Sequence, residues 1–309
     1  MATGIYTNRS NISLPAEVSS EIIAKTQDAS AVMSLARQVA LPGRGLSIPV
    51  ITSDPEAAWV AETGQKPTSN PGLSTKTMTP YKLAVIVPFS DEFARDARGL
   101  YDALVERLPL ALAQKFDKTV FSGVAPGSGF DVLTSCTGQS IDTNASGEGG
   151  FYNALVAADI DVASHGYDVN GFAFSAQARG EMLSAVDRDG RPIFINNVAE
   201  GAIPRLLGQP VVYSKGLYKA GNAASGSSGQ TGYVPASPDV LGVAGDWTKA
   251  LYGTVEGVKI DISNQASLTI GTSVVNLWEH NMFAVKAEIE VGFVADTDAF
   301  NRIVRTHTV

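Results

Sequence analysis

Hydrophobic and polar positions alternate along two long segments, and this period-two pattern is typical of a strand with one buried face. The clearer segment lies near the C-terminus, where Lys286, Glu288 and Glu290 take the polar positions. Its apolar positions are Phe283, Val285, Ala287, Ile289, Val291 and Phe293. A strand this long with two unlike faces must pack its apolar side on a core.

The second alternating segment runs from Leu73 to Val87 and follows a stretch of turn-forming residues. Residues 64–72 are rich in Pro, Gly, Ser and Asn, and Ala57 to Thr63 is a strand candidate anchored by Trp59. Together these segments predict a long hairpin. Because an isolated two-stranded hairpin is marginally stable in water, it is expected to lie either on a neighbouring subunit or on its own domain.

Apolar residues three and four positions apart predict several helices. The strongest pattern follows Phe89-Ser90-Asp91-Glu92 and contains Pro109, which is expected to bend the helix. Its apolar residues are Leu104, Val105, Leu108, Leu112, Phe116 and Val120. The other predicted helices are Ala16 to Val39, Phe151 to His165 with Leu155, Val156 and Ile160 on one face, and Ser175 to Val186 with Ser175 as N-cap.

Shorter strands are predicted between these helices, so the fold class is mixed α+β. They are Leu46 to Thr52, Val169 to Phe174, a strand ending at Tyr213, Val240 to Ala244 and Val255 to Ile262. Met1 to Ser13 is polar without periodicity and is expected to be an arm. Asp187 to Gly190 is a predicted turn, and residues 216–238 are a predicted loop.

Composition adds limits on the partners of this 309-residue chain. Only 17% of residues are charged, against roughly 25% in a typical soluble protein. Either partners cover much of the surface, or neutral Gly, Ser and Thr residues solvate it. The net charge of −8 and the lack of a basic patch predict weak, non-specific contacts with DNA. The chain has no signal-peptide core or membrane-spanning apolar run and is expected to be soluble and intracellular when made.

Candidate catalytic chemistry is absent from the sequence. His165, His280 and His307 lack metal-ligand spacing, and Cys136 has no histidine near it in sequence. Asp187-x-Asp189-Gly190 starts like a calcium loop but lacks the later ligands. Without phosphate-loop, dinucleotide or nucleophile-elbow motifs, no metal, cofactor or enzymatic activity is expected.

Several short motifs resemble, in order, those of tailed-bacteriophage major capsid proteins with the Hong Kong 97 fold. They are Trp59-Val60-Ala61-Glu62, Lys82-Leu83-Ala84, Ser90 to Asp96, Phe121-Ser122-Gly123 with Pro126-Gly127, Asp187 to Pro192, Leu207-Gly208-Gln209-Pro210-Val211, Gly245-Asp246-Trp247 and Ala299-Phe300. Each motif is weak by itself. Their order and spacing, from about Leu14 to Val304, make the resemblance specific.

The resemblance implies a division of the chain and two sets of assembly residues. The division is 1–45 for an N-terminal arm and helix, 46–88 for an extended hairpin called the E-loop, 89–134 with 271–309 for a peripheral domain with a long spine helix, and 135–270 for an axial domain. The implied intersubunit E-loop residues are Trp59, Glu62, Lys66, Lys76 and Lys82. The implied spine-helix residues are Leu104, Leu108, Pro109, Leu112 and Phe116.

Some members of this family join subunits through an isopeptide bond, which needs a lysine, an asparagine and a carboxylate. Lys66 near the hairpin tip and the pair Asn276 and Glu279 are the candidates in this sequence. The alternative, that Lys66 is an ordinary solvated or ion-pairing lysine, is favoured because most surface charges do only that.

The resemblance also implies partners. Copies of the chain would form pentamers and hexamers of an icosahedral shell around double-stranded DNA, assembled in the host cytoplasm and retained in the virion capsid. Because the chain reaches the family's N-terminal helix almost at once, a separate scaffolding protein is expected, with a portal protein and a decoration protein as further partners. The rival interpretations are an encapsulin-type bacterial shell holding protein cargo, and a small α+β enzyme or adhesion domain.

Overall fold

The computed structural model describes most of the chain from Ser30 to Thr306. The residues outside this description are 1–29, 54, 56, 61–64, 67, 70–71, 97, 142–149, 188, 195–204, 224, 226–235, 271–272 and 307–309. The predicted N-terminal arm and most of the first predicted helix therefore lie outside the described residues.

A five-stranded sheet is organised around β14 (Met282–Ala295), the long alternating strand predicted near the C-terminus. Its other strands are β1 (Arg37–Ala40), β4 (Tyr81–Ser90), β10 (Ala250–Thr254) and β11 (Lys259–Ser263). β4 pairs antiparallel along one edge of β14, and β10 and β11 pair along the other. The apolar face of β14 packs against α4 (Arg98–Ser122), as the alternation predicts.

A six-stranded sheet forms a second unit, covered by α5 (Gly150–Ser164) and α6 (Ala176–Ser184). Its strands in spatial order are β5 (Thr137–Ile141), β15 (Phe300–Arg305), β9 (Asp239–Gly245), β6 (Gly171–Phe174), β8 (Gln209–Tyr213) and β7 (Arg205–Leu206). The Ser175 side chain accepts a hydrogen bond from the Ala178 N–H, which confirms the predicted N-cap of α6.

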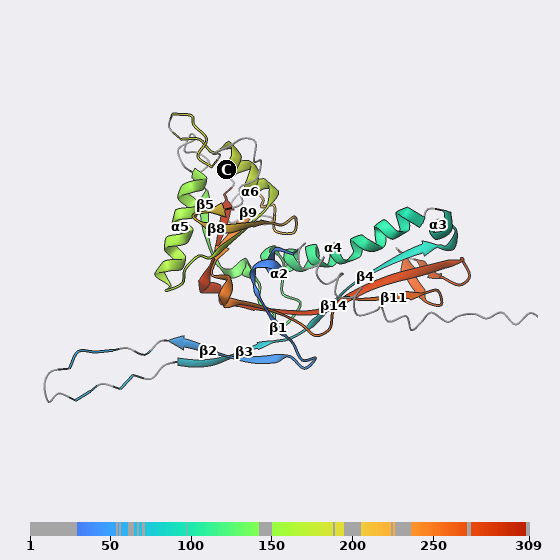
Figure 1. Ribbon diagram of the computed structural model, residues 1–309, viewed down its shortest axis with the longest axis horizontal. Helices are drawn as coiled ribbons and strands as arrows, with labels where there is room; N and C mark the ends of the chain where they lie inside the picture. Colours follow the sequence, from blue (N-terminus) through green and yellow to red (C-terminus); the bar gives the residue numbers. More distant parts are fainter. Residues whose placement is uncertain are drawn as a thin grey trace, which may run out of the picture.

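The remaining elements are short or project from these two units. They are α2 (Ala31–Leu35), α3 (Asp91–Asp96), the two-stranded pair β2 (Leu46–Ser53) and β3 (Gly72–Met78), the pair β12 (Ser267–Ile270) and β13 (Ser273–Asn276), and three short 3₁₀ turns. The molecule is elongated: β2 and β3 extend from one end, α3 lies at the opposite end, and the six-stranded unit rises between them (Figure 1).

Two large apolar cores hold these units together, and a smaller cluster lies at the base of β2 and β3. The larger lies between α4 and the five-stranded sheet, where the rings of Phe116, Phe130 and Phe293 meet with centroids 6.3–6.4 Å apart. The smaller fills the six-stranded unit under α5 and α6, around Phe172 and Phe174. Pro109 stays inside the continuous helix α4.

The sequence prediction of one helix over Ala16 to Val39 is wrong for its described end. Helix α2 covers only Ala31–Leu35, and Ala36 is extended with φ −80° and ψ 156°. The chain then continues as β1, which pairs parallel with β10. Val39, at the end of the predicted helix, pairs instead with Gly253 of β10, a long-range contact that a local pattern does not reveal.

The predicted hairpin also has a different partner strand. Ala57–Val60 are not a strand, and β3 pairs with β2, in the register Leu46 to Met78. The alternating segment Leu73 to Val87 breaks at Thr79 and Pro80, where the Thr79 N–H turns to the Gly129 carbonyl at 2.8 Å. Beyond that break, β4 pairs with β14 instead of continuing the hairpin.

Two smaller predictions differ as well. Ile160 does not share the buried face of Leu155: it is 63% exposed, and the buried face of α5 is Phe151, Ala154, Leu155, Ala158 and Val162. Val255 to Val258 are not in a strand, since β10 ends at Thr254 and β11 begins at Lys259.

Sheet membership crosses the predicted domain ranges. β10 and β11 lie within 135–270 but belong to the five-stranded sheet with β14. β15 lies within 271–309 but sits inside the six-stranded sheet, between β5 and β9. The chain therefore passes between the two units several times, which ties them together covalently.

Candidate assembly surfaces

The projecting hairpin has a fixed base and an uncovered tip. At its base, Met78 is fully buried with Leu41 and Val294. Lys76 donates to the Ala295 carbonyl at 2.5 Å and forms an ion pair with Asp131 at 2.8 Å. These contacts fix the orientation of the hairpin relative to the five-stranded sheet.

At two positions in this base, the backbone geometry requires glycine. Gly45 has φ +86°, and a Cβ there would lie 2.7 Å from the Met78 carbonyl oxygen. Gly129 has φ +75°, and a Cβ there would lie 2.8 Å from the Thr77 carbonyl oxygen. Both positions combine a left-handed backbone with a close approach, which only glycine accepts without strain.

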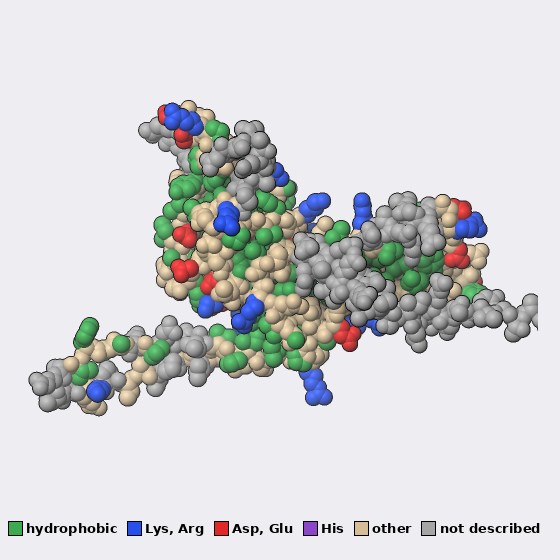
Figure 2. All heavy atoms as spheres, in the orientation of Figure 1, with side chains coloured by type: hydrophobic (Ala, Val, Ile, Leu, Met, Phe, Trp, Pro, Cys, Tyr) green, Lys and Arg blue, Asp and Glu red, His purple; other side chains and the backbone are tan. Residues whose placement is uncertain are grey.

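Beyond the base, the described residues between positions 55 and 69 are all exposed. The Trp59 side chain has a relative exposure of 105%, and Val60 is 40% exposed. The visible hairpin surface is mainly apolar and neutral polar (Figure 2). An uncovered tryptophan on a projecting hairpin matches the surface through which one subunit reaches another, because tryptophan is enriched among the residues that dominate interface energies.

The other sequence-selected hairpin residues are distributed differently. Lys66 is exposed, and Glu62 lies outside the described residues. Lys76 forms the ion pair with Asp131 described above. Lys82 lies on β4 and pairs with Glu290 of β14 at 3.1 Å; this hydrogen bond raises the pKa of Lys82.

The polar face of the five-stranded sheet continues this charge pairing. Lys286 lies 3.0 Å from Asp261 and 3.1 Å from Glu288, and the hydrogen bond to Asp261 is the main cause that raises the pKa of Lys286. Opposite charges on adjacent strands therefore neutralise one another on this face, so that the sheet presents little net charge to a partner.

The spine-helix candidates lie on α4 as the helical pattern predicts. Leu108, Leu112 and Phe116 are buried against the five-stranded sheet. Leu104 lies on the same helix, though its side chain is not among those described.

A buried carboxylate on α4 joins three parts of the chain. Asp117 is fully buried and accepts from Ser30 Oγ at 2.5 Å, the Ala31 N–H at 2.9 Å, the Val32 N–H at 3.4 Å and Ser214 Oγ at 2.6 Å. Burial is the main influence on its pKa and raises it, while these hydrogen bonds oppose the shift. The start of α2, the helix α4 and the segment after β8 thus meet at one side chain.

Sequence reasoning missed Asp117, although a signal was present. It lies four residues after Ala113 and four before Phe121, both fully buried, so it interrupts an apolar face of the helix. A charge at such a position must find several hydrogen-bond partners.

The candidate cross-link residues occupy two ends of the molecule. Asn276 and Glu279 share the turn after β13, where Asn276 Nδ2 donates to Glu279 Oε1 at 3.1 Å and Asn276 Oδ1 accepts from the Trp278 N–H at 3.2 Å. This turn is held near α3 by the hydrogen bond from the Asp91 N–H to the Asn281 carbonyl, at the end opposite the hairpin that carries Lys66 (Figure 1). Only two different subunits can bring these groups together.

Neither a metal-binding group nor a reactive cysteine is present among the described residues. They hold no group of three His, Cys, Asp or Glu side chains placed for a metal ion. Cys136 is buried, and burial raises its pKa to about 12, which disfavours the reactive thiolate. Within the same described ranges, no helix has the length and apolarity to cross a membrane.

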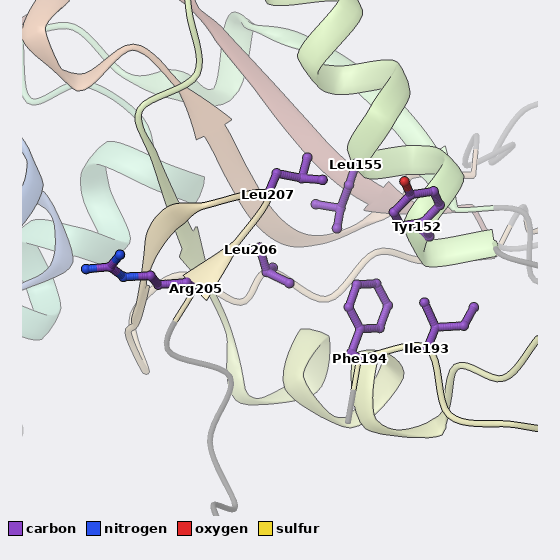
Figure 3. Close-up of a pocket in the computed structure, with 7 residues that line it drawn as sticks. All are labelled: Tyr152, Leu155, Ile193, Phe194, Arg205, Leu206 and Leu207. Carbon is purple, nitrogen blue, oxygen red and sulfur yellow. The ribbon is translucent and has the colours of Figure 1, made fainter. Parts of the chain in front are cut away.

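A small hollow in the six-stranded unit does not change this conclusion. It encloses about 220 Å³ and is lined by Tyr152, Leu155, Ile193, Phe194, Arg205, Leu206 and Leu207. The Arg205 side chain points away from the other lining residues (Figure 3). The hollow therefore brings no acid, base and nucleophile together.

The chain belongs to the phage capsid family, whose model matches residues 11–304. It is 26% identical over 302 residues to the probable major capsid protein gp17 of Mycobacterium phage L5, covering 94% of this chain and 88% of that protein.

Solved structures share the fold. A chain from Mycobacterium phage Bobi superposes with a TM-score of 0.71 at 20% identity, covering 91% of both chains. A chain from Gordonia phage Cozz gives a TM-score of 0.70 at 21% identity, covering 90% of this chain and 87% of that one. The family assignment confirms the predictions of a capsid component and of a structural protein rather than an enzyme, and these matches give no support to the encapsulin alternative.

Proposed function

We propose that the chain is the major capsid protein of a tailed phage, and that copies of it assemble into pentamers and hexamers of an icosahedral shell around double-stranded DNA. The observation that carries this proposal is the hairpin with its fixed base and uncovered Trp59. A two-stranded hairpin gains too little by itself to stay ordered in water, so a neighbouring copy must cover it.

In this proposal the hairpin is the E-loop, and α4 is the spine helix of a peripheral domain formed with the five-stranded sheet. The six-stranded unit with α5 and α6 is the axial domain. The sheet pairings support a division in which β10 and β11 join the peripheral domain and β15 joins the axial domain.

The partners follow from the same proposal. A scaffolding protein and a portal protein would direct assembly in the host cytoplasm, and a decoration protein would bind the finished shell. Packaged DNA would be held weakly, because a chain with net charge −8 repels phosphate except at local basic groups.

Purified protein is expected to form closed particles of megadalton mass when concentrated, because heterologous contacts repeat around closed rings. Analytical ultracentrifugation and electron microscopy of the same sample measure mass and closure. A sample that remains monomeric or dimeric at high concentration, with and without a co-expressed scaffolding protein, contradicts the proposal.

We expect the subunits of such particles to remain unlinked by covalent bonds. The Asn276 amide is occupied at both ends by its own turn, and attack by Lys66 would have to break these hydrogen bonds. On a denaturing gel, the particles should give one band at the 32.3 kDa of a single chain. A ladder that disappears in Lys66→Arg would instead establish the isopeptide bond.

A further inference from the structure

Helix α4 carries a row of basic side chains on the side that faces away from the five-stranded sheet. Arg107, Lys115 and Lys118 are exposed, whereas Leu112 is buried against the sheet. At about 100° and 1.5 Å per residue, the three cations lie within one quarter of the helix circumference and span about 16 Å. From Arg107 to the end of α4 the only acidic residue is the buried Asp117. This side of the helix is therefore basic, although the whole chain has a net charge of −8.

A fourth cation comes from the segment after β8. Lys215 is exposed and lies between Ser214, whose hydroxyl donates to Asp117, and Gly216, where a Cβ would lie 3.1 Å from the Lys118 backbone nitrogen. The hydrogen bond to Asp117 thus places Lys215 beside the row on α4. Lys and Arg side chains project from the molecule along this helix (Figure 2). We call Arg107, Lys115, Lys118 and Lys215 the basic face.

The two sides of the five-stranded unit differ in charge balance. On the side opposite α4, Lys82 pairs with Glu290 at 3.1 Å, and Lys286 lies within 3.1 Å of both Asp261 and Glu288. In the part of the chain that the structure describes, no such ion pair joins a cation of the basic face to an acidic side chain. The unit therefore has one neutralised side and one side with uncompensated positive charge.

We propose that the basic face lines the inside of the shell and contacts the phosphates of packaged double-stranded DNA. This inference rests on the proposed shell function and names the surface that the DNA meets. Double-stranded DNA carries one negative charge per about 1.7 Å of its axis, so a row of cations about 16 Å long faces several phosphates at once. Lysine and arginine contacts to phosphate carry no sequence information, which suits packaged DNA of any sequence.

An acidic protein segment would also be attracted to this face, but the neighbouring side chains favour DNA. Protein interfaces are usually anchored by aromatic side chains that fill pockets. The exposed residues between the cations of α4 include Ala111 and Gln114, which are small or polar and offer no such anchor. Phosphate contacts need only charge and N–H donors.

The contact is tested by lysine acetylation of particles made from the unmodified chain. Three states are compared by mass spectrometry: particles filled with DNA, particles emptied of DNA, and the precursor that contains scaffolding protein. We expect Lys115, Lys118 and Lys215 to react at least about fivefold more slowly in filled than in emptied particles, because a nearby phosphate keeps the amine protonated and shielded. Lys82 and Lys259, on the opposite side of the sheet, should react equally in both states.

A matched pair of variants supplies a second readout. Lys115→Gln with Lys118→Gln removes two charges from the basic face, and Lys82→Gln with Lys259→Gln removes two from the opposite side, so both variants change the net charge equally. Unassembled subunits are titrated against a short fluorescent DNA duplex at several salt concentrations. Each lost phosphate contact lowers the slope of log K against log salt by about 1, so the slope should fall by about 2 in the first variant only.

The outcomes separate this contact from the shell function. Equal acetylation of the three lysines in filled and emptied particles, or equal salt slopes in the two variants, overturns the DNA contact alone. Slow acetylation in the scaffold-containing precursor that is lost once DNA replaces the scaffold would assign the basic face to an acidic protein and also overturn it. If the unmodified chain forms no particle, the shell function fails and this contact fails with it.

Discussion

Replacing residues 54–71 with an Asn-Gly turn should leave a folded subunit that no longer forms shells. In the structure Ser53 pairs with Gly72, so a two-residue turn can close the shortened hairpin there. The buried Met78 and the Lys76 ion pair with Asp131 remain at the base. Shortening a loop lowers its closure cost by roughly 0.6 kcal/mol per halving, so the subunit should lose no stability.

The expected loss lies in assembly. The truncated subunit lacks the exposed hairpin surface, including Trp59, through which the proposed contact with a neighbour is made. Urea unfolding of the free subunit and sedimentation of the assembly mixture measure the two properties separately. Val124→Ala, which removes an exposed apolar side chain elsewhere, should assemble normally. Shells of normal size and yield from the truncated chain would show that the hairpin is not an assembly element.

Substituting Asp117 should produce a large loss of subunit stability. Asp117→Ala leaves four donors without an acceptor: two serine hydroxyls, and the backbone N–H groups of Ala31 and Val32. Each buried donor left unpaired costs about 1–3 kcal/mol, but the hydroxyls can turn to other partners. The free energy of unfolding should therefore fall by about 3 kcal/mol or more, mainly from the backbone groups.

Asp117→Asn removes the negative charge but nearly keeps the shape of the side chain. Each carboxylate oxygen of Asp117 accepts from one serine hydroxyl and one backbone N–H. An amide keeps only one acceptor oxygen and places its own donors against the other pair, so one backbone N–H loses its partner. We expect a loss of about 1–3 kcal/mol, smaller than for alanine. As a control, Asp159→Asn on the exposed face of α5 should be neutral.

The difference in stability between the native chain and Asp117→Asn should depend on pH, and the sign of this dependence follows from the pKa of Asp117. Burial raises the pKa of Asp117 above its usual 3.8, so the folded state binds a proton more readily than the unfolded state. The contribution of this group to stability is greatest below pH 3.8 and is lost as the pH rises through the higher folded pKa. The stability of the native chain minus that of Asp117→Asn should therefore increase as the pH falls toward 4. An unchanged difference between neutral pH and pH 4 would show that Asp117 does not titrate with the raised pKa.

The Asp117 junction also connects stability with assembly. It joins the chain entering at α2, the helix α4 and the segment that follows β8. Gly216 lies against this junction, where a Cβ would meet the Gln114 carbonyl oxygen at 2.6 Å. A weakened junction should loosen the contact between α4 and the six-stranded unit, and the contacts between copies need a defined arrangement of these units.

The sequence by itself determined the elements whose pattern is local. Alternation alone identified β14 and its buried face, because strand geometry sends successive side chains to opposite sides. Apolar spacing identified α4, and Ser175 before an apolar run identified the start of α6. The ordered motifs indicated the capsid family, and the match over residues 11–304 confirmed it.

Only the tertiary structure decided which segments meet. β14 pairs with β4, about 200 residues earlier in the chain, and β3 pairs with β2 rather than with the segment around Trp59. Asp117 finds partners 85–97 residues away in the chain, and Trp278 stays exposed while the adjacent Leu277 is buried. Periodicity specifies which side of an element is apolar, but the surface that covers it depends on long-range packing.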